Sequence, residues 1–271
     1  MRRRELVALV VLVALATAGC SRLTFVKADA SRRGMDRVAP EYTFGETEAS
    51  KRRAEARRQI ALAERHLRAG DVGEAAEAAR AAVKADRELP EAHTMLALVA
   101  MGQGKPELAG THYAEAARLG PSGITYNNYG AWLCSNDRPA ESLGWFDQAL
   151  GDPRYGDRAG ALANAGACAA RAGEYERVER DLRAALELDP VNLVALGAMA
   201  EESMRQGQYL EARAFSQRRL AAGGATPAVL ELASRIEDKL GDSVAAQRYV
   251  ERLRTEFPQA LNAIPGESST P

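Results

Sequence analysis

The sequence contains few of the residues that carry catalysis or bind metals. Its 271 residues include three histidines and three cysteines, and they form no His-Glu-x-x-His pair, nucleophile elbow or Cys–His spacing. The stretch Gly102-Gln103-Gly104-Lys105 lacks the earlier glycine of a phosphate-binding loop, and Pro106 stands where Ser or Thr must ligate magnesium. We therefore expect no enzyme, no metal or cofactor site and no small-molecule substrate.

The sequence also has no large excess of positive or negative charge, and aromatic residues are scarce. Lys and Arg number 36 against 37 Asp and Glu, which leaves no basic excess for a nucleic-acid partner. Aromatic residues make up 6% of the chain, whereas apolar residues reach 46%. This composition, rich in alanine, favours helices that pack at close range around a full core.

The longest apolar run lies at the N-terminus. Three arginines precede the 13 residues Leu6–Ala18, which are too few to span a bilayer as a mature helix. This order predicts a signal peptide over residues 1–19. The small residues before Cys20 resemble a bacterial lipobox, in which the cysteine thiol is acylated. Thr17 stands where Leu is usual, so an ordinary secretory signal is the alternative.

Acylation of Cys20 would anchor the chain to a membrane. Several acyl chains together give stable anchoring. Ser21 follows the cysteine, and in lipoproteins of this kind that residue implies sorting to the outer membrane. We therefore expect a lipid-anchored protein on the periplasmic face of the outer membrane. Residues 20–50 show no apolar periodicity, which predicts a flexible linker.

Small residues recur through the rest of the chain at nearly fixed intervals. Members of the first series are separated by 34, 33, 36, 34 and 34 residues: Gly70, Gly104, Asp137, Gly173, Gly207 and Gly241. A second series follows the first, five residues later each time: Ala75, Ala109, Ser142, Val178, Ala212 and Ala246. This period is typical of tetratricopeptide repeats, and the second series marks where two helices approach too closely for bulky side chains.

A tetratricopeptide repeat is a helical hairpin that cannot bury its apolar face alone, so the repeats stack. We predict an all-α fold, a right-handed superhelical solenoid of about six hairpins over residues 51–261, followed by a flexible tail at 262–271. The predicted repeats span 56–89, 90–122, 123–158, 159–192, 193–226 and 227–261. Repeat three is longer by two residues, which indicates either a function or a tolerated insertion in a surface loop.

Several short stretches resemble a known family. The stretches are Asn127-Asn128-Tyr129-Gly130, Tyr155-Gly156-Asp157-Arg158, Asn164-Ala165-Gly166 and Gly223-Gly224. Together with the lipobox and the six repeats, they resemble the type IV pilus biogenesis and stability lipoproteins called PilW or PilF. The resemblance implies an outer-membrane lipoprotein of six tetratricopeptide repeats. It also implies a pilotin, which helps the pilus secretin to localise and multimerise in the outer membrane.

The first helices of repeats one and two predict a binding groove. Positions 2, 5, 9 and 12 of such a helix line the concave face, and here they include Ile60, Leu67, Leu98 and Met101. An exposed apolar stripe of this kind marks a partner-binding surface. Two alternatives remain, namely that the linker or an additional N-terminal segment covers these side chains, or that the repeat frame is shifted by one residue.

Four polar or aromatic residues are candidates for either binding or structure. Asn128 and Asn164 share position 6 of successive repeats, where their amides can bind a partner's backbone or the last carbonyls of the neighbouring repeat. We favour the structural role. Tyr155 and Arg158 can likewise hold the long connection of repeat three in place.

Cys134 and Cys168 lie in the first helices of repeats three and four. A disulfide is possible in the periplasm, and it requires Cα atoms within about 7 Å of each other. Because the two cysteines occupy different positions within their repeats, we favour the alternative, two buried cysteines that act as small apolar residues.

These patterns predict a non-enzymatic scaffold. The resemblance implies that its groove captures secretin subunits, and the lipobox predicts that an acyl anchor holds the scaffold to outer-membrane lipid. The alternative is a periplasmic tetratricopeptide adaptor that recruits peptidoglycan enzymes.

Overall fold

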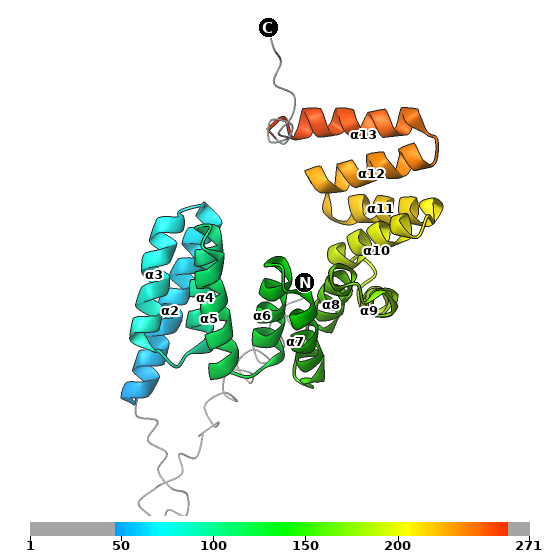
Figure 1. The fold of residues 1–271 in the computed structure, drawn as a ribbon. Helices are drawn as coiled ribbons and strands as arrows, with labels where there is room; N and C mark the ends of the chain where they lie inside the picture. Colours follow the sequence, from blue (N-terminus) through cyan, green and yellow to red (C-terminus); the bar gives the residue numbers. More distant parts are fainter. Residues whose placement is uncertain (1–46, 260–271) are drawn as a thin grey trace, which may run out of the picture. The chain divides into compact units, whose positions relative to one another are not determined.

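A computed structural model describes residues 47–259, which form twelve helices and, within that range, no strand (Figure 1). The predicted signal peptide, Cys20, most of the predicted linker and the predicted tail lie outside these residues. The helices are α2 (Glu48–Ala69), α3 (Val72–Ala85), α4 (Pro90–Gly102), α5 (Pro106–Leu119), α6 (Gly123–Ser135), α7 (Pro139–Gly151), α8 (Arg158–Ala172), α9 (Tyr175–Leu188), α10 (Leu193–Arg205), α11 (Tyr209–Gly223), α12 (Pro227–Lys239) and α13 (Ser243–Glu256).

The helices pair into six hairpins, as the repeat period predicts. Within each hairpin the two helices make the most extensive contacts, and the second helix then packs against the first helix of the next hairpin. α2 begins at Glu48, inside the predicted linker, because the side chain of Thr47 caps it by accepting a hydrogen bond from the Ser50 N–H at 3.0 Å. The array therefore starts three residues earlier than the sequence pattern suggests.

The turn inside each hairpin has a left-handed residue. The first series of small residues occupies this position, with φ between 59° and 83° in all six repeats. At Gly70 the backbone N–H bonds back to the carbonyls of His66 and Leu67, which closes α2. Asp137 is the one non-glycine residue with positive φ among residues 47–259. Glycine has no Cβ to clash in this conformation, which explains why it recurs at this position.

The second series lies where the two helices of a hairpin approach each other. Each of its six members is at most 3% exposed. Larger side chains of the second helices fill the space beside this approach, and Phe146 and Leu182 are fully buried there. The core is therefore a chain of small clusters between helices rather than one central mass.

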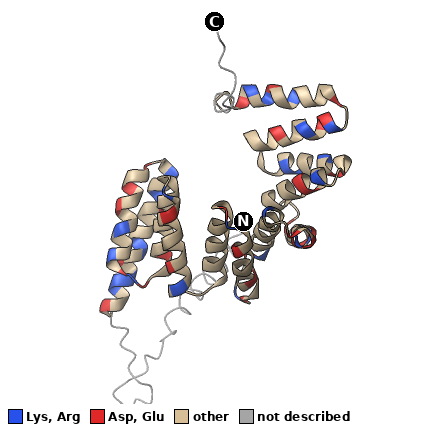
Figure 2. Cartoon of the chain, in the orientation of Figure 1, with Lys and Arg blue, Asp and Glu red and all other residues tan. Residues whose placement is uncertain are grey.

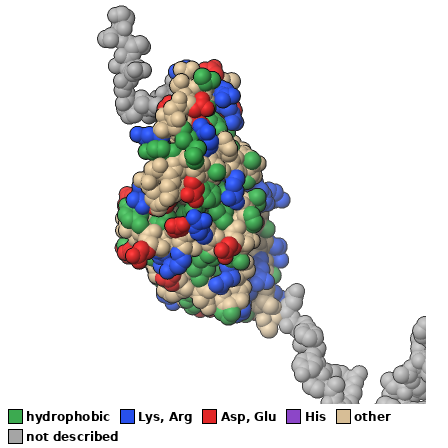
Figure 3. Space-filling model, turned by 90° about the vertical axis from the view of Figure 1, so that its right-hand side faces the viewer, with side chains coloured by type: hydrophobic (Ala, Val, Ile, Leu, Met, Phe, Trp, Pro, Cys, Tyr) green, Lys and Arg blue, Asp and Glu red, His purple; other side chains and the backbone are tan. Residues whose placement is uncertain are grey.

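Charged residues of both signs are interspersed along the helices (Figure 2). Many form pairs one helical turn apart, such as Arg118 with Glu115 at 2.6 Å and Arg183 with Glu179 at 2.7 Å. Between them, apolar side chains reach the surface in scattered places, as one face of the molecule shows (Figure 3). Among the described residues, no helix combines the length and the apolar character that a membrane crossing requires.

A disulfide joins repeats three and four. Cys134 in α6 and Cys168 in α8 are bonded, with an S–S distance of 2.04 Å and Cα atoms 5.8 Å apart. The interpretation of these cysteines as separate apolar residues is therefore wrong. α6 and α8 contact each other directly, which brings the two side chains together despite their different positions within the repeats.

The left-handed turn of repeat three generates a first prediction. We expect Asp137→Val to lower the free energy of unfolding by about 1–2 kcal/mol, because a β-branched side chain clashes at positive φ. Asp137→Gly should raise it by about 0.5 kcal/mol. Loss of the exposed ion pair of Asp137 with Arg171, at 3.3 Å, should matter little in both variants. Urea unfolding followed by circular dichroism measures both changes, and equal stability of the two variants would contradict the assigned turn.

The disulfide generates a second prediction. Replacing both cysteines, Cys134→Ala with Cys168→Ala, should lower stability by about 3–4 kcal/mol, because the bond closes a loop across 34 residues in the unfolded chain. Reduction of the wild type should lower the thermal midpoint to that of the double variant, and the reductant should leave the double variant unchanged. An unaltered midpoint of the reduced wild type would show that the bond does not support the array.

Candidate partner-binding groove

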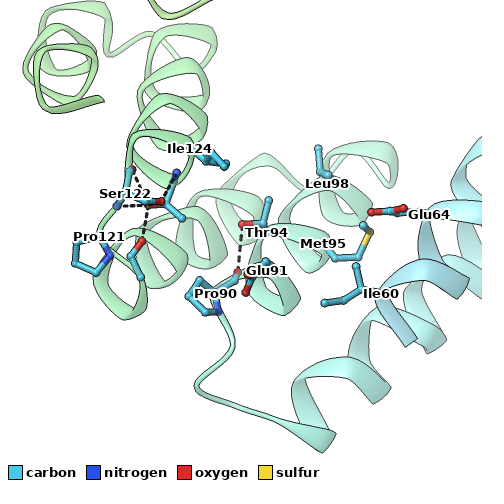
Figure 4. Close-up of a pocket in the computed structure, with 12 residues that line it drawn as sticks. Ile60, Glu64, Pro90, Glu91, Thr94, Met95, Leu98, Pro121, Ser122 and Ile124 are labelled. Carbon is cyan, nitrogen blue, oxygen red and sulfur yellow. Dashed lines mark hydrogen bonds between the residues drawn. The ribbon is translucent and has the colours of Figure 1, made fainter. Parts of the chain in front are cut away.

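A groove of about 410 Å³ opens on the first helices of repeats one to three (Figure 4). Its volume lies within the range of ligand pockets, about 300–1,000 Å³. Its walls are α2, α4, and the start of α6 with the loop before it. The lining residues are Ile60, Glu64, Pro90, Glu91, Thr94, Met95, Leu98, Gly120, Pro121, Ser122, Ile124 and Thr125.

The groove is apolar where its side chains are largest. Met95 forms a buried floor at 4% exposure, and Ile60 beside it is half-buried. Leu98 and Ile124 are 44% and 62% exposed, although both are large aliphatic residues. Covering an exposed apolar cluster of this kind with a partner is favourable, because it removes apolar surface from water.

The spacing of the first helices keeps the groove open. α2 packs directly on α4, whereas α4 and α6 make little contact with each other, although α6 packs against α5 as each first helix packs on the preceding second helix. Trp132 of α6 lies at this junction, where its Nε1 donates a hydrogen bond to the Pro106 carbonyl at 2.9 Å. A Cβ on Gly110 of α5 would come within 2.1 Å of the Trp132 ring, so only glycine allows this approach.

Local hydrogen bonds fix the start of α6, which forms one end of the groove. Ser122 and Thr125 make a reciprocal capping box, in which the Ser122 N–H donates to Thr125 Oγ1 at 3.2 Å. The Thr125 hydroxyl also donates to the Gly120 carbonyl at 2.8 Å. These bonds satisfy the polar groups at this end of the groove and leave the side chain of Ile124 exposed.

The long connection of repeat three supports the same helix end. Asp152 accepts a hydrogen bond from the Gly123 N–H at 2.9 Å, and this bond holds the pKa of the Asp152 carboxyl below its usual value. The ring of Tyr155 packs against Gly123, where a Cβ would lie only 2.3 Å from it. Burial, with a smaller effect of nearby Asp157, raises the pKa of Tyr155 to about 12. The residues of the long connection therefore position a wall of the groove.

Tyr155 and Arg158 have the structural role that the sequence suggested as one possibility. Tyr155 is 8% exposed and packs with Ala149 and Ala161. Arg158 Nη1 donates to the Leu150 carbonyl at 2.6 Å, which ties the start of α8 to the end of α7. Both residues hold the connection in place.

Of the two predicted asparagines, Asn128 lies half-buried in α6, and only Asn164 makes a side-chain hydrogen bond among the described residues. Asn164 Nδ2 in α8 donates to Asn127 Oδ1 in α6 at 3.1 Å, so this amide joins successive repeats. Its partner is a side chain rather than the helix-end carbonyl that we expected. Asn127, next to Asn128 in the sequence, is the residue that makes this bond, and sequence position alone did not identify it.

The groove contains only part of the predicted stripe. Ile60 and Leu98 line it, but Leu67 is partly buried against the core cluster of α2, α3 and α4 without lining the groove, and Met101 lies outside the lining at 40% exposure. Both outlying residues occupy position 12, near the turn of the hairpin. Most lining residues of α2 and α4 occupy positions 2, 5 and 9, whereas Pro90 and Met95 occupy positions 1 and 6, and Ile124 is position 2 of repeat three. Extending the same rule to repeat three would have identified it.

Two histidines meet away from the groove. His93 Nδ1 and His112 Nδ1 are 3.4 Å apart, and His93 Nε2 lies 3.0 Å from the Arg87 carbonyl. Burial, and then the neighbouring His93, lowers the pKa of His112. Within residues 47–259, no group of three His, Cys, Asp or Glu side chains is placed to hold a metal ion.

Comparisons with known proteins agree with the architecture. The sequence model of the tetratricopeptide repeat matches residues 60–124, which include all the residues that line the groove except Thr125. No curated protein matches the sequence. The crystal structure of PilW, described as a widely conserved type IV pilus biogenesis factor, is 28% identical with a TM-score of 0.68, covering 75% of this chain and 94% of PilW.

Two further structures support the fold alone. PilF of Pseudomonas aeruginosa is 24% identical with a TM-score of 0.66, covering 78% of this chain and 96% of PilF. A chain of the APC/C hetero-tetramer Cut9–Hcn1 is 14% identical with a TM-score of 0.68, covering 76% of this chain and 40% of that chain. The described residues therefore form a tetratricopeptide-type solenoid, and the chain is similar in sequence and fold to the type IV pilus biogenesis factor PilW.

Proposed function

We propose that this protein is a lipid-anchored scaffold of the outer membrane that acts as a pilotin in type IV pilus biogenesis. In this role it binds secretin subunits and promotes their localisation and multimerisation in the outer membrane. The observation that carries the proposal is the apolar groove of repeats one to three, in a chain similar to a pilus biogenesis factor. Tetratricopeptide arrays are generally scaffolds for protein interactions.

The groove suits the capture of a protein segment. Its walls are helices that are already stacked and capped, so little ordering accompanies binding. Covering the exposed parts of Leu98 and Ile124 should contribute about 1 kcal/mol each. Such values support a moderate affinity, which allows a secretin subunit to be released when it joins its multimer.

The membrane anchor rests on the sequence, because Cys20 lies outside the described residues. The lipobox-like end of the signal peptide and Ser21 support an acylated protein at the outer membrane. The anchor would hold the groove at the membrane into which the secretin inserts. Anchoring and capture are separate properties, so variants can test them separately.

A test in cells addresses the whole proposal. In cells that lack this protein, we expect unheated outer-membrane extracts to lose the heat-resistant secretin multimers while secretin monomers remain. Unchanged multimers would contradict the pilotin role. Co-purification from membranes then distinguishes a secretin partner from the peptidoglycan enzymes of the alternative hypothesis.

Our third prediction concerns the groove. Leu98→Glu places a charge among apolar side chains, so the variant should bind the secretin at least tenfold more weakly while its helicity stays intact. Leu108→Glu is the matched control, because Leu108 of α5 is 46% exposed, nearly the same as Leu98, but lies outside the groove. Pull-down of the secretin with both variants, with circular dichroism for folding, makes the comparison. Normal capture by a folded Leu98→Glu variant would exclude this groove.

Our fourth prediction concerns the anchor. Cys20→Ala removes the thiol that would be acylated, so the protein should move from the membrane fraction to the soluble fraction, with unchanged helicity. Thr17→Leu is the control, because it brings the lipobox closer to the usual pattern and should keep the protein in the membrane. Fractionation after a high-salt wash gives the readout. Retention of the Cys20→Ala variant in the membrane would rule out the lipid anchor.

A further inference from the structure

The groove carries negative charge beside its apolar floor. Two of the twelve lining residues are glutamates, Glu64 of α2 and Glu91 of α4, and none is a lysine, arginine or histidine. Both glutamates are exposed, and they occupy concave positions 9 and 2 of their repeats. Figure 4 shows Glu64 beside Met95 and Glu91 beside Thr94, so the carboxylates border the apolar side chains.

Neither carboxylate forms a strong ion pair with another residue of the described array. Glu64 has one cation nearby, Arg68 at 3.9 Å, in an exposed pair one turn apart on α2. Such a pair changes an equilibrium by about twofold, so a bound cation can replace it at small cost. Glu91 lies in the first turn of α4 and takes part in none of the ion pairs of residues 47–259.

Resting on the proposed function, we propose that the groove recognises a protein segment in which a large aliphatic or aromatic side chain is followed closely by lysine or arginine. The apolar side chain lies on Met95, Leu98 and Ile124, and the cation lies by Glu64 or Glu91. Charge complementarity is the argument, because an apolar surface bordered by two carboxylates favours a cationic flank and disfavours an acidic one. The cation sets specificity, and the apolar contact provides most of the affinity.

Peptide binding to the full chain tests this inference. Three labelled peptides share the apolar core Leu-Ile-Phe and differ only in its flank, which is two lysines, two serines or two glutamates. Fluorescence anisotropy should give the tightest binding for the lysine peptide, about five- to tenfold tighter than the serine peptide, and the weakest for the glutamate peptide. The difference should shrink as salt rises from about 0.05 to 0.5 M, because the carboxylates are solvent-exposed.

Neutral variants then identify the residues responsible. Glu64→Gln with Glu91→Gln should reduce the lysine advantage to less than about twofold and leave the serine peptide unchanged. Glu77→Gln with Glu107→Gln is the matched control, since Glu77 pairs with Arg80 on α3, Glu107 lies in the first turn of α5, and both are outside the groove. The control should keep the full lysine advantage.

The outcomes separate this inference from the proposed function. If Leu98→Asn weakens all three peptides but the wild type shows no lysine preference, the groove stands and the charge inference is overturned. A lysine preference that survives Glu64→Gln with Glu91→Gln overturns it too, as does the absence of binding by the lysine peptide. If Leu98→Asn binds all three as well as the wild type does, the groove itself is wrong. Binding only after removal of residues 21–46 would make that segment the occupant and overturn a separate partner.

Discussion

The close approach of two helices at small residues is the constraint on which the rest of this structure depends. Ala75, Ala109 and their equivalents are at most 3% exposed, and a larger side chain at these positions would separate the helices of a hairpin. The left-handed turn five residues earlier reverses the chain tightly enough to permit this contact. Hairpins built in this way cannot bury all their apolar surface, so they stack, and stacking places the first helices of successive repeats beside one another.

The candidate groove occurs where the first helices of repeats two and three make little contact with each other. Between repeats two and three, α6 lies against α5, with Trp132 bonded to the Pro106 carbonyl in the space that Gly110 leaves free. The long connection of repeat three then fixes the start of α6 through Asp152 and Tyr155. Contacts of this kind hold α6 in place without filling the space between α4 and α6. The apolar groove stays open because contacts outside it hold α6 in position. The exposed lining residues are therefore free to bind a partner.

Sequence spacing predicted the parts of this structure that repeat and missed the parts that occur once. The period identified six hairpins, their turn residues and the concave positions that include Ile60 and Leu98. It failed at position 12, near the hairpin turn, where neither Leu67 nor Met101 lines the groove. Two contacts depend on how neighbouring repeats are rotated, which no local pattern specifies. They are the hydrogen bond between Asn164 and Asn127 and that between Trp132 and the Pro106 carbonyl. The disulfide was an open alternative for the same reason.

The exposure of the groove residues argues that they contribute to binding more than to folding. Leu98 and Ile124 keep much of their surface in water, so their burial adds far less to stability than that of Phe146 or Leu182. A moderate contact of this type becomes effective when partner and scaffold are held at the same membrane, since confinement raises the effective concentration without new contacts. In the proposed function, the anchor and the groove would have complementary tasks. The anchor would ensure encounter, whereas the groove with Glu64 and Glu91 at its border would select the segment that is held, and its limited apolar area would let that segment leave.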